Sequence, residues 1–247
     1  MTLDLQLKAL KFTSTAKEVQ QLCDKAIHTQ PGYQQHIQNL LDHEIQKRQN
    51  QILLRQMKRA QLPTDHDLDE FDATFAQGIT KTQLQQLRVL NWLDQAYNII
   101  LMGPPGVGKT FIAAGLGCEA LKQGHRVYFR TMEEIRRLLI FKDRLKQAGQ
   151  EYRRLINAHL VIIDDMLVFP LDKHESVDLY HLIDTLHEQT SLIITTNKAP
   201  KEWGEILADQ AIATAILDRL IYHAQVISLQ GESYRMKHRK SIYEKEE

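Results

Sequence analysis

The sequence predicts an α/β fold: a parallel sheet sandwiched by helices, preceded by a small all-α N-terminal domain. Two features predict it. From Tyr97 onward, short apolar runs that are typical of buried strands alternate with longer helical patterns, and this order produces a parallel sheet. Before Pro63, the apolar residues keep a helical spacing. The 247 residues suffice for one large domain, or for a medium domain and a small one.

Residues 1–63 are expected to form the helical domain. They are rich in Gln, Lys and Leu, and the helical pattern is interrupted only at Pro31 and Gly32. After this break, apolar residues recur at spacings of three and four, at Ile37, Leu40, Leu41 and Ile45. Pro63 ends the last helix, because a proline disfavours the helical conformation of the residue before it.

Residues 64–96 are expected to form a linker, TDHDLDEFD, and a leading helix around QLQQLRVLNWL. The second domain then covers residues 97–247. Its strands are expected at 97–103, 126–131, 158–164, 191–197 and 224–231. Its helices are expected at 111–124, 132–155, 175–189 and 212–221, with Gly124 as a C-terminal cap. The strand at 158–164 is a continuous apolar run, so both of its faces should be buried.

A phosphate-binding loop follows the first of these strands. The stretch GPPGVGKT fits the pattern G-x-x-x-x-G-K-[ST] without exception, after a strand and before a helix. Its glycines let successive backbone N–H groups point at phosphate oxygens, and the helix adds its N-terminal dipole. The lysine reaches the β- and γ-phosphates, and the threonine hydroxyl ligates Mg²⁺. ATP and Mg²⁺ are the expected cofactors, and the expected nucleotide contacts are Gly103, Pro104, Gly106, Val107, Gly108, Lys109, Thr110 and Phe111.

Two acidic residues end the apolar strand LVIID. A carboxylate at this position can hold Mg²⁺ through water, which suits Asp164. Asp165 is placed to polarise the attacking water as a general base. The alternative is a pair of acids that cap a turn, but two adjacent acids beside so apolar a strand are costly without a cation.

Two further polar residues are candidates for the same site. Asn197 ends the apolar strand SLIITTN and could orient the water or contact the γ-phosphate, although asparagine commonly ends strands. Arg219, in ILDRL, lies near a helix end. Taken alone, it is expected to pair with Asp218 or to lie on the surface.

Composition restricts the other partners. Lys+Arg and Asp+Glu both total 31, so any binding to nucleic acid must come from local patches. Cys23 and Cys118 fit no metal or disulfide framework, which indicates a reducing compartment. No apolar stretch has the length of a signal peptide core or of a membrane span. A cytoplasmic location without membrane contact is expected.

Taken together, these motifs resemble the AAA+ ATPases of the initiator and helicase-loader group. A closer resemblance, over nearly the whole chain, is to the IstB family, the ATPases of two-component insertion-sequence transposition systems. The DnaC and DnaI helicase loaders are close relatives of that family. The most specific stretches are NKAPKEWGEILAD and ILDRLIYHAQVISLQGESYR, which generic phosphate-loop ATPases lack.

The resemblance implies roles for individual residues. It makes Lys109 and Thr110 the Walker A pair and Asp164 the Walker B metal residue. Asp165 occupies the position of the catalytic acid, where many members have Glu. Because Asp is one methylene shorter, hydrolysis is expected to be slower and ATP binding intact. Val107 stands where Thr is common, which should not matter because the backbone binds the phosphates.

The resemblance also extends to oligomer-dependent residues. It makes Asn197 the sensor 1 residue and Arg219 an arginine finger that acts on ATP held by the neighbouring subunit. Arg235, in GESYR, is a candidate for the sensor 2 arginine, although the family has little of the usual AAA+ lid. ATP is therefore expected at the interfaces of a homo-oligomer.

Basic patches are the expected DNA contacts, mainly to backbone phosphate. One patch lies in the N-terminal domain, which the resemblance implies binds DNA or the transposase; a solvated helix face explains it equally well. A second lies in the 132–155 region, which in the initiator group faces the inner channel of the oligomer. A third covers Arg235, Lys237, His238, Arg239 and Lys240. The residues of the first two patches taken as DNA contacts are Lys47, Arg48, Arg55, Lys58, Arg59, Arg136 and Arg137.

The expected function is that of an ATP-dependent, DNA-binding oligomer that assists a transposase of the IstA type in target DNA capture and is switched by ATP hydrolysis. A replicative helicase loader is the alternative, with the same chemistry and a helicase ring as partner. A nucleotide-gated DNA scaffold with negligible turnover is the third possibility.

Overall fold

The computed structural model describes residues 2–63, 66–71 and 77–237, without the side chain of Arg235. Its contacts divide the chain into two compact units, Met1–Lys58 and Arg59–Glu247. The sequence placed a domain boundary near Pro63 and a linker after it, whereas this division falls inside a helix and assigns the linker to the second unit. The functional division of the chain into domains stays a prediction.

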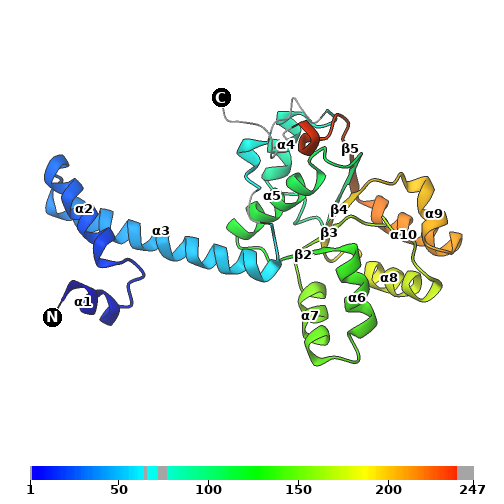
Figure 1. The fold of residues 1–247 in the computed structure, drawn as a ribbon, viewed down its shortest axis with the longest axis horizontal. Coiled ribbons are helices and arrows are strands. Elements are labelled where there is room, and N and C mark those ends of the chain that lie inside the picture. The colour runs from blue at the N-terminus through cyan, green and yellow to red at the C-terminus, as the bar shows by residue number, and fades with distance from the viewer. Residues whose placement is uncertain (1, 64–65, 72–76, 238–247) are drawn as a thin grey trace, which may run out of the picture. The chain divides into compact units, whose positions relative to one another are not determined.

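The first unit is helical, as the sequence predicts (Figure 1). It contains α1 (Leu3–Ala9), α2 (Ala16–Thr29) and α3 (Tyr33–Ala60) as far as Lys58. The break between α2 and α3 falls at Pro31 and Gly32. A buried carboxylate on α3, that of Glu44, accepts hydrogen bonds from the backbone N–H and the hydroxyl of both Thr13 and Ser14, and so fixes the turn that precedes α2.

The second unit contains a sheet of five parallel strands in the order β2-β3-β4-β1-β5. The strands are β1 (Asn98–Met102), β2 (Val127–Thr131), β3 (Leu160–Asp164), β4 (Ser191–Thr196) and β5 (Ala224–Ser228). Every residue of β3 and β4 is buried, which confirms the expectation that apolar runs form strands covered on both faces. β1 lies between β4 and β5, so the loop that follows β1 starts near the ends of β3 and β4.

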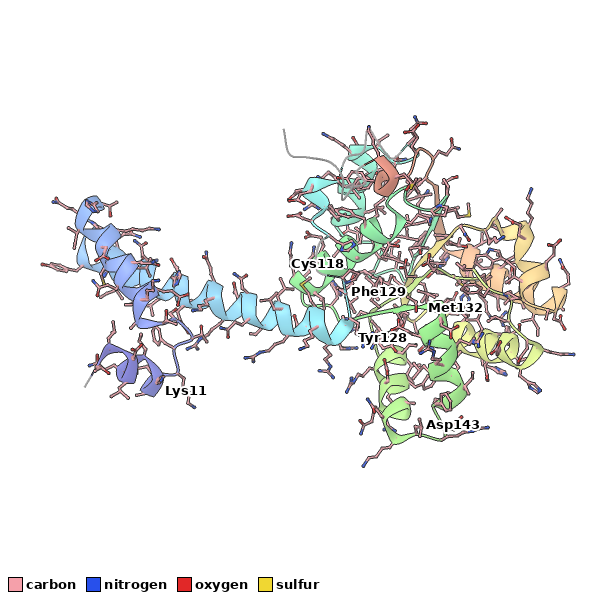
Figure 2. The ribbon with its side chains drawn as sticks, in the orientation of Figure 1. Lys11, Cys118, Tyr128, Phe129, Met132 and Asp143 are labelled. Carbon is pink, nitrogen blue, oxygen red and sulfur yellow. The ribbon has the colours of Figure 1, made fainter. Side chains whose placement is uncertain are left out.

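Helices cover both faces of this sheet (Figure 1). The longer ones are α4 (Lys81–Arg88), α5 (Lys109–Lys122), α6 (Met132–Phe141), α7 (Lys146–Ile156), α8 (Lys173–Leu186) and α10 (Gln210–Tyr222). Short helical turns are η1 (Leu68–Glu70), η2 (Pro200–Glu202), α9 (Trp203–Ile206) and α11 (Tyr234–Lys237). α5 packs on one face of the sheet, and α6, α8 and α10 form a core with the other face. Their side chains fill the space between the layers (Figure 2).

Two of the predicted helices have other bounds in the structure. The basic helix expected over residues 132–155 is two helices, α6 and α7, which pack on each other. A single helix of that length would extend roughly 36 Å, and the turn between α6 and α7 instead lets both apolar faces reach the core, through Ile135, Leu138 and Leu155. The leading helix near residue 83 ends at Arg88, before its expected apolar end. In the part of the chain that the structure describes, no helix combines the length and the apolar character that crossing a membrane requires.

Candidate nucleotide site

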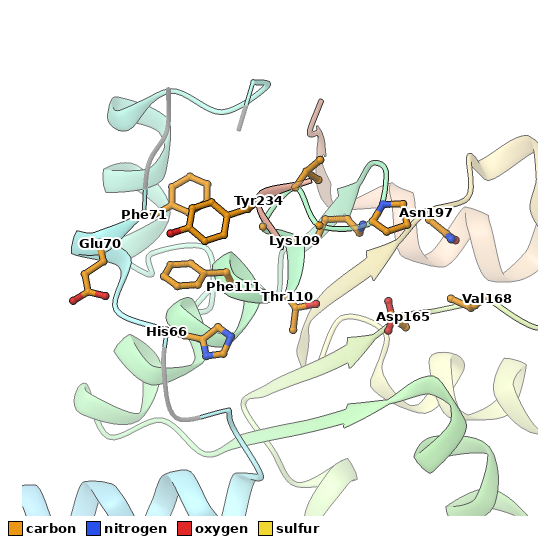
Figure 3. Close-up of a pocket in the computed structure, with 14 residues that line it drawn as sticks. His66, Glu70, Phe71, Lys109, Thr110, Phe111, Asp165, Val168, Asn197 and Tyr234 are labelled. Carbon is orange, nitrogen blue, oxygen red and sulfur yellow. The ribbon is translucent and has the colours of Figure 1, made fainter. Parts of the chain in front are cut away.

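A cavity of about 530 Å³ opens beside the N-terminus of α5, at the edge of the sheet where β1, β3 and β4 end. The cavity takes part of its lining from the phosphate loop, part from the ends of β3 and β4, and part from the segment before α4 (Figure 3). Because the carboxyl ends of parallel strands meet at one edge of the sheet, the motifs that the sequence separates by tens of residues come together here.

The phosphate loop has the curled backbone that its glycines predict. Gly106 and Gly108 have φ values of 86° and 96°, which only glycine adopts without strain. The side chain of Lys109 is buried, and its Nζ donates hydrogen bonds to the carbonyl oxygens of Gly103 and Pro104, at 2.8 Å each. These two residues, expected as nucleotide contacts, therefore hold the lysine and do not line the cavity. The other predicted loop residues line it: Gly106, Val107, Gly108, Lys109, Thr110 and Phe111.

Oxygen donors suited to Mg²⁺ meet at the end of β3. The Thr110 hydroxyl donates to Oδ1 of Asp164 at 2.9 Å, as expected of a Walker A threonine next to a Walker B aspartate. Asp164 is buried, and this burial raises the pKa of its carboxyl, although hydrogen bonds from Thr195 and Thr110 oppose the rise. A nearby cation would favour the ionised carboxylate. One carboxylate and one hydroxyl suit Mg²⁺, which usually takes its remaining ligands from water and phosphate.

The two residues predicted to act on water, Asp165 and Asn197, both line the cavity and are both exposed. Figure 3 shows them on the side of the cavity away from the aromatic side chains, with Lys109 and Thr110 between the two groups. Asp165 has a φ of 53°, a left-handed conformation that is uncommon for a residue with a side chain. The site therefore holds a phosphate loop, a candidate metal ligand and a candidate base in one cavity.

The opposite wall is aromatic, and no local sequence motif predicts it. Phe71 and Phe111 stack with ring centroids 5.8 Å apart, and His66 lies 5.1 Å from Phe111 (Figure 3). Such rings offer flat faces for a heterocyclic base. The cavity residues absent from the prediction are His66, Glu70, Phe71, Pro105, Val168 and Tyr234.

Two glycines of α5 allow the segment that carries this wall to lie close to the helix. A Cβ added at Gly115 would lie 2.5 Å from side-chain atoms of Leu68, and a Cβ at Gly117 would lie 3.0 Å from Leu62. Leu68 and Leu62 are both buried. The described part of the stretch expected as a linker, residues 66–71, therefore lies against α5 at Leu68 and supplies part of the cavity lining.

The segment after β5 lies over the phosphate loop. The backbone N–H of Tyr234 donates to the carbonyl of Gly106 at 3.0 Å, and a Cβ at Gly106 would lie 2.1 Å from Oγ of Ser233. This is the GESYR stretch on which the family resemblance partly rests. The side chain of Arg235, and residues 238–240 of the third basic patch, lie outside the described residues.

Arg219 is outside the cavity, on α10, and binds α8. Its Nε donates to Oδ1 of Asp184 at 2.8 Å, and its Nη2 donates to the Tyr180 hydroxyl at 2.8 Å. The guanidinium also lies over the Tyr180 ring, 4.7 Å from the centroid. Of the two alternatives that the sequence left for an isolated arginine, a pair with Asp218 or a surface position, the pair with Asp218 is not formed: the partner is Asp184, because adjacent helix residues point about 100° apart.

The basic residues expected to contact DNA differ in their exposure and in whether they form ion pairs with acidic residues. Arg136 lies between Glu175, at 3.2 Å, and Glu133, at 3.7 Å, while Arg137 pairs with Glu133 and is 69% exposed. In the first unit, Lys47 pairs with Glu18 and Arg48 with Glu44. Arg55, Lys58 and Arg59 are exposed.

Known relatives match almost the whole chain. The sequence profile of the family described as IstB-like ATP binding protein matches residues 5–242. A protein of Bacteroides fragilis, named for an IS21-like insertion sequence and for ATP binding, is 43% identical over 234 residues, which cover 95% of this chain and 89% of the relative. A protein of Pseudomonas aeruginosa, named in the same way for IS21, is 32% identical and covers 96% of this chain and 90% of the relative.

Solved structures agree on the fold. The DnaC helicase loader matches with a TM-score of 0.54 at 20% identity, over 67% of this chain and 97% of that one. DnaA from Aquifex aeolicus, bound to AMPPCP, matches with a TM-score of 0.54 at 18% identity, over 71% of this chain and 54% of that one. The parallel sheet with its phosphate loop is thus an AAA+ fold, as expected. By its sequence, the chain belongs to the family of IstB-like ATP binding proteins, which includes those of IS21 insertion sequences.

Proposed function

We propose that this protein hydrolyses ATP in the cavity beside α5 and uses ATP binding and hydrolysis to capture target DNA and to activate a transposase. The observation that carries the proposal is the meeting of the phosphate loop, Thr110 and Asp165 in one cavity of about 530 Å³. The Asp164 carboxylate is buried and does not line the cavity, but it accepts a hydrogen bond from Thr110, which does. Family membership supplies the insertion-sequence context.

Each part of the cavity has a chemical role in this proposal. The loop N–H groups and Lys109 bind the triphosphate, and the base stacks against the aromatic wall formed by Phe71 and Phe111. The Thr110 hydroxyl and the Asp164 carboxylate hold Mg²⁺, which neutralises charge on the phosphates when it is bound. Asp165 accepts a proton from the attacking water.

Asn197 orients the attacking water in the same proposal. Arg219 supplies positive charge to ATP held by the next subunit, so the active form is a homo-oligomer with ATP at its interfaces. Its side chain is 25% exposed and lies on α10, outside its own cavity, which supports a role in trans.

The partner in this proposal is a transposase of the IstA type. Four relatives that are 33% to 43% identical to this chain over the matched residues are named for insertion sequences. The helicase loaders share the fold at 20% identity or less, which carries no information on the partner.

The test measures ATP hydrolysis by the full chain alone, with duplex DNA, and with DNA plus the transposase encoded by the neighbouring gene. We expect the rate to rise when both are present, and DNA binding to be tighter with ATP than with ADP. If the transposase changes neither hydrolysis nor DNA binding, while a replicative helicase changes them, the partner is the helicase and not the transposase. DNA binding gated by ATP without turnover under any condition would indicate a scaffold.

A further inference from the structure

A single hydroxyl on β4 contacts both acidic residues of the nucleotide site. Oγ1 of Thr195 donates to Oδ1 of Asp164 at 2.5 Å and accepts from the backbone N–H of Asp165 at 2.9 Å. A hydroxyl has one hydrogen to donate and lone pairs that accept. The bond to Asp164 therefore uses the only hydrogen of the Thr195 hydroxyl, and the bond from Asp165 uses a lone pair. Thr195 is fully buried, with an exposed fraction of 0%.

The sheet register explains why these groups meet. β3 and β4 are parallel neighbours, and Ile163 is paired with Ile194. The next residue is Asp164 in β3 and Thr195 in β4. Residues at the same register of neighbouring parallel strands point to the same face of a sheet, so these two side chains meet. β4, which ends one residue before the candidate sensor residue Asn197, thereby places a hydroxyl against the Asp164 carboxylate.

The hydrogen bond from the backbone N–H of Asp165 to Thr195 Oγ1 helps to hold the backbone conformation of Asp165. Asp165 is exposed and has a left-handed φ of 53°, which persists only where the surroundings hold it. Besides Thr195 Oγ1, which accepts from Asp165, the carbonyl of Thr195 accepts from the N–H of Met166 at 2.8 Å. The chain that leaves β3 is therefore fixed to β4 at the residue that carries the candidate base.

We infer that Thr195 is a positioning residue for the ATPase site: its hydroxyl orients the Asp164 carboxylate toward Mg²⁺ and holds Asp165 in the conformation that presents its side chain to the cavity. This inference rests on the proposed function, because it assigns Thr195 a role in the same Mg²⁺-dependent reaction. Partners that orient a metal ligand typically change metal affinity or activity 10- to 100-fold when they are removed.

Three variants of the full chain separate this role from ordinary packing. Thr195→Val removes the hydroxyl and keeps the shape, and Thr195→Ser restores the hydroxyl. Thr190→Val is the matched control: Thr190 is also buried, and its hydroxyl donates to the carbonyl of Ala158 at 3.2 Å, but it lies just before the start of β4, away from the nucleotide site. Each variant is measured for thermal unfolding, for binding of a fluorescent ATP analogue over a range of Mg²⁺ concentrations, and for kcat and KM of hydrolysis.

We expect Thr195→Val to bind the analogue in the absence of Mg²⁺ as the wild type does. The Mg²⁺ concentration at which Mg²⁺ exerts half of its effect on analogue binding should rise roughly tenfold. At saturating Mg²⁺ and ATP, kcat should fall roughly 10- to 100-fold. Thr195→Ser should recover both properties. Thr190→Val should lower the unfolding temperature and leave the Mg²⁺ response and kcat unchanged.

The opposite results are equally distinct. If Thr195→Val keeps the wild-type Mg²⁺ response and kcat, or if Thr195→Ser fails to recover them, Thr195 acts through packing alone and the inference is overturned. The Mg²⁺ response tests Asp164 even if turnover is too slow to measure. If Mg²⁺ does not change ATP binding by the wild type, the proposed Mg²⁺ site and this inference are both overturned. If Mg²⁺ changes ATP binding by the wild type and Thr195→Val needs more Mg²⁺ for the same change, both are supported.

Discussion

The Arg219 guanidinium is bound to Asp184, on the neighbouring helix of its own chain, with Nε 2.8 Å from Oδ1. Tyr180 accepts a second hydrogen bond from it, and the carbonyl of Ala215 accepts a third at 3.1 Å. Arginine has five N–H donors, so two remain for a phosphate. The hydrogen bond to Asp184 raises the pKa of Arg219, which keeps the side chain charged. These contacts fix a charged group on α10 and leave part of its donor set for another molecule.

The first prediction tests whether Arg219 acts on a neighbouring subunit. Arg219→Ala should bind ATP nearly as the wild type does and should lose hydrolysis, because arginine fingers contribute on the order of 10³–10⁵ in rate. Mixing Arg219→Ala with Lys109→Ala should recover part of the activity, since one kind of interface then joins an intact loop to an intact arginine. Hydrolysis rates of the two variants and of their mixture provide the measurement.

The control for that mixture is the formation of mixed oligomers, followed with differently labelled chains. Mixed oligomers that remain as inactive as either parent would show that Arg219 does not act in trans. Its contacts with Asp184 and Tyr180 would then be only structural.

The second prediction concerns Asp165. Asp165→Asn keeps the shape and removes the proton acceptor, so ATP and Mg²⁺ should still bind while kcat falls about 10²- to 10⁴-fold. ATP-bound complexes on DNA should persist longer as a result. Single-turnover hydrolysis and the lifetime of the DNA complex measure both effects. An unchanged kcat would move the catalytic role away from Asp165, with Asp164 the next candidate.

The third prediction separates two arginines that the sequence treated alike. Arg136 is opposed by two glutamates, whereas Arg137 is 69% exposed and pairs with Glu133 alone. Arg137→Gln should weaken binding to all DNA sequences alike and reduce the salt slope by about 1, as expected for one phosphate contact. Arg136→Gln should change DNA binding less. Titrations at several salt concentrations test this, and equal effects of the two variants, or an effect on one DNA sequence only, would contradict it.

The fourth prediction uses the buried carboxylate of the first unit. Burial opposes ionisation of Glu44, but hydrogen bonds from Ser14, Thr13 and Arg48 outweigh it and lower its pKa to about 2. A lowered folded-state pKa gives stability that is complete above the ordinary value of 4.5 and is lost as the pH falls toward about 2. Glu44→Gln should therefore destabilise the first unit at pH 7 by about 1–3 kcal/mol, the cost of losing hydrogen bonds to a charged group.

That destabilisation should shrink as the pH falls from 4.5 toward 2, because the wild-type carboxylate is then protonated. Hydrogen exchange of the Thr13 and Ser14 amides, which donate to Glu44, locates the effect in this turn. Asp42→Asn changes an exposed carboxylate on the same helix and serves as the control. A difference between Glu44→Gln and the wild type that stays constant between pH 5 and pH 2 would rule out the assigned role of the charge.

Local sequence patterns predicted the parts of the site that depend on a few adjacent residues. The phosphate loop needs its glycines and lysine in one short stretch, and Asp164 follows from an apolar strand that ends in an acid. The aromatic wall could not be predicted in this way, because His66 and Phe71 reach the cavity only through the packing of Leu68 on α5. Gly115 was the one local signal, and it shows that a chain lies close without showing which one.

The same limit applies to contacts between elements. Thr195 was visible as a polar residue in a buried strand, but its partners depend on the register of β3 against β4. The partner of Arg219 depends on how α10 packs on α8, and the sequence offered only its neighbour in the chain. The turn between α6 and α7 contains no proline or glycine, so no local signal divided the expected helix there.

The most direct test of the account is ATP binding by Lys109→Ala, because every proposed step begins with a triphosphate on this loop. Lys122→Ala, at the exposed end of the same helix, is the control. The measurement is the affinity for a fluorescent ATP analogue with Mg²⁺. Loss of the loop lysine should weaken binding roughly 10- to 150-fold, which corresponds to about 1.5–3 kcal/mol for a hydrogen bond to a charged group, while Lys122→Ala binds as the wild type does. Wild-type affinity in Lys109→Ala would contradict the assignment of this cavity as the ATP site.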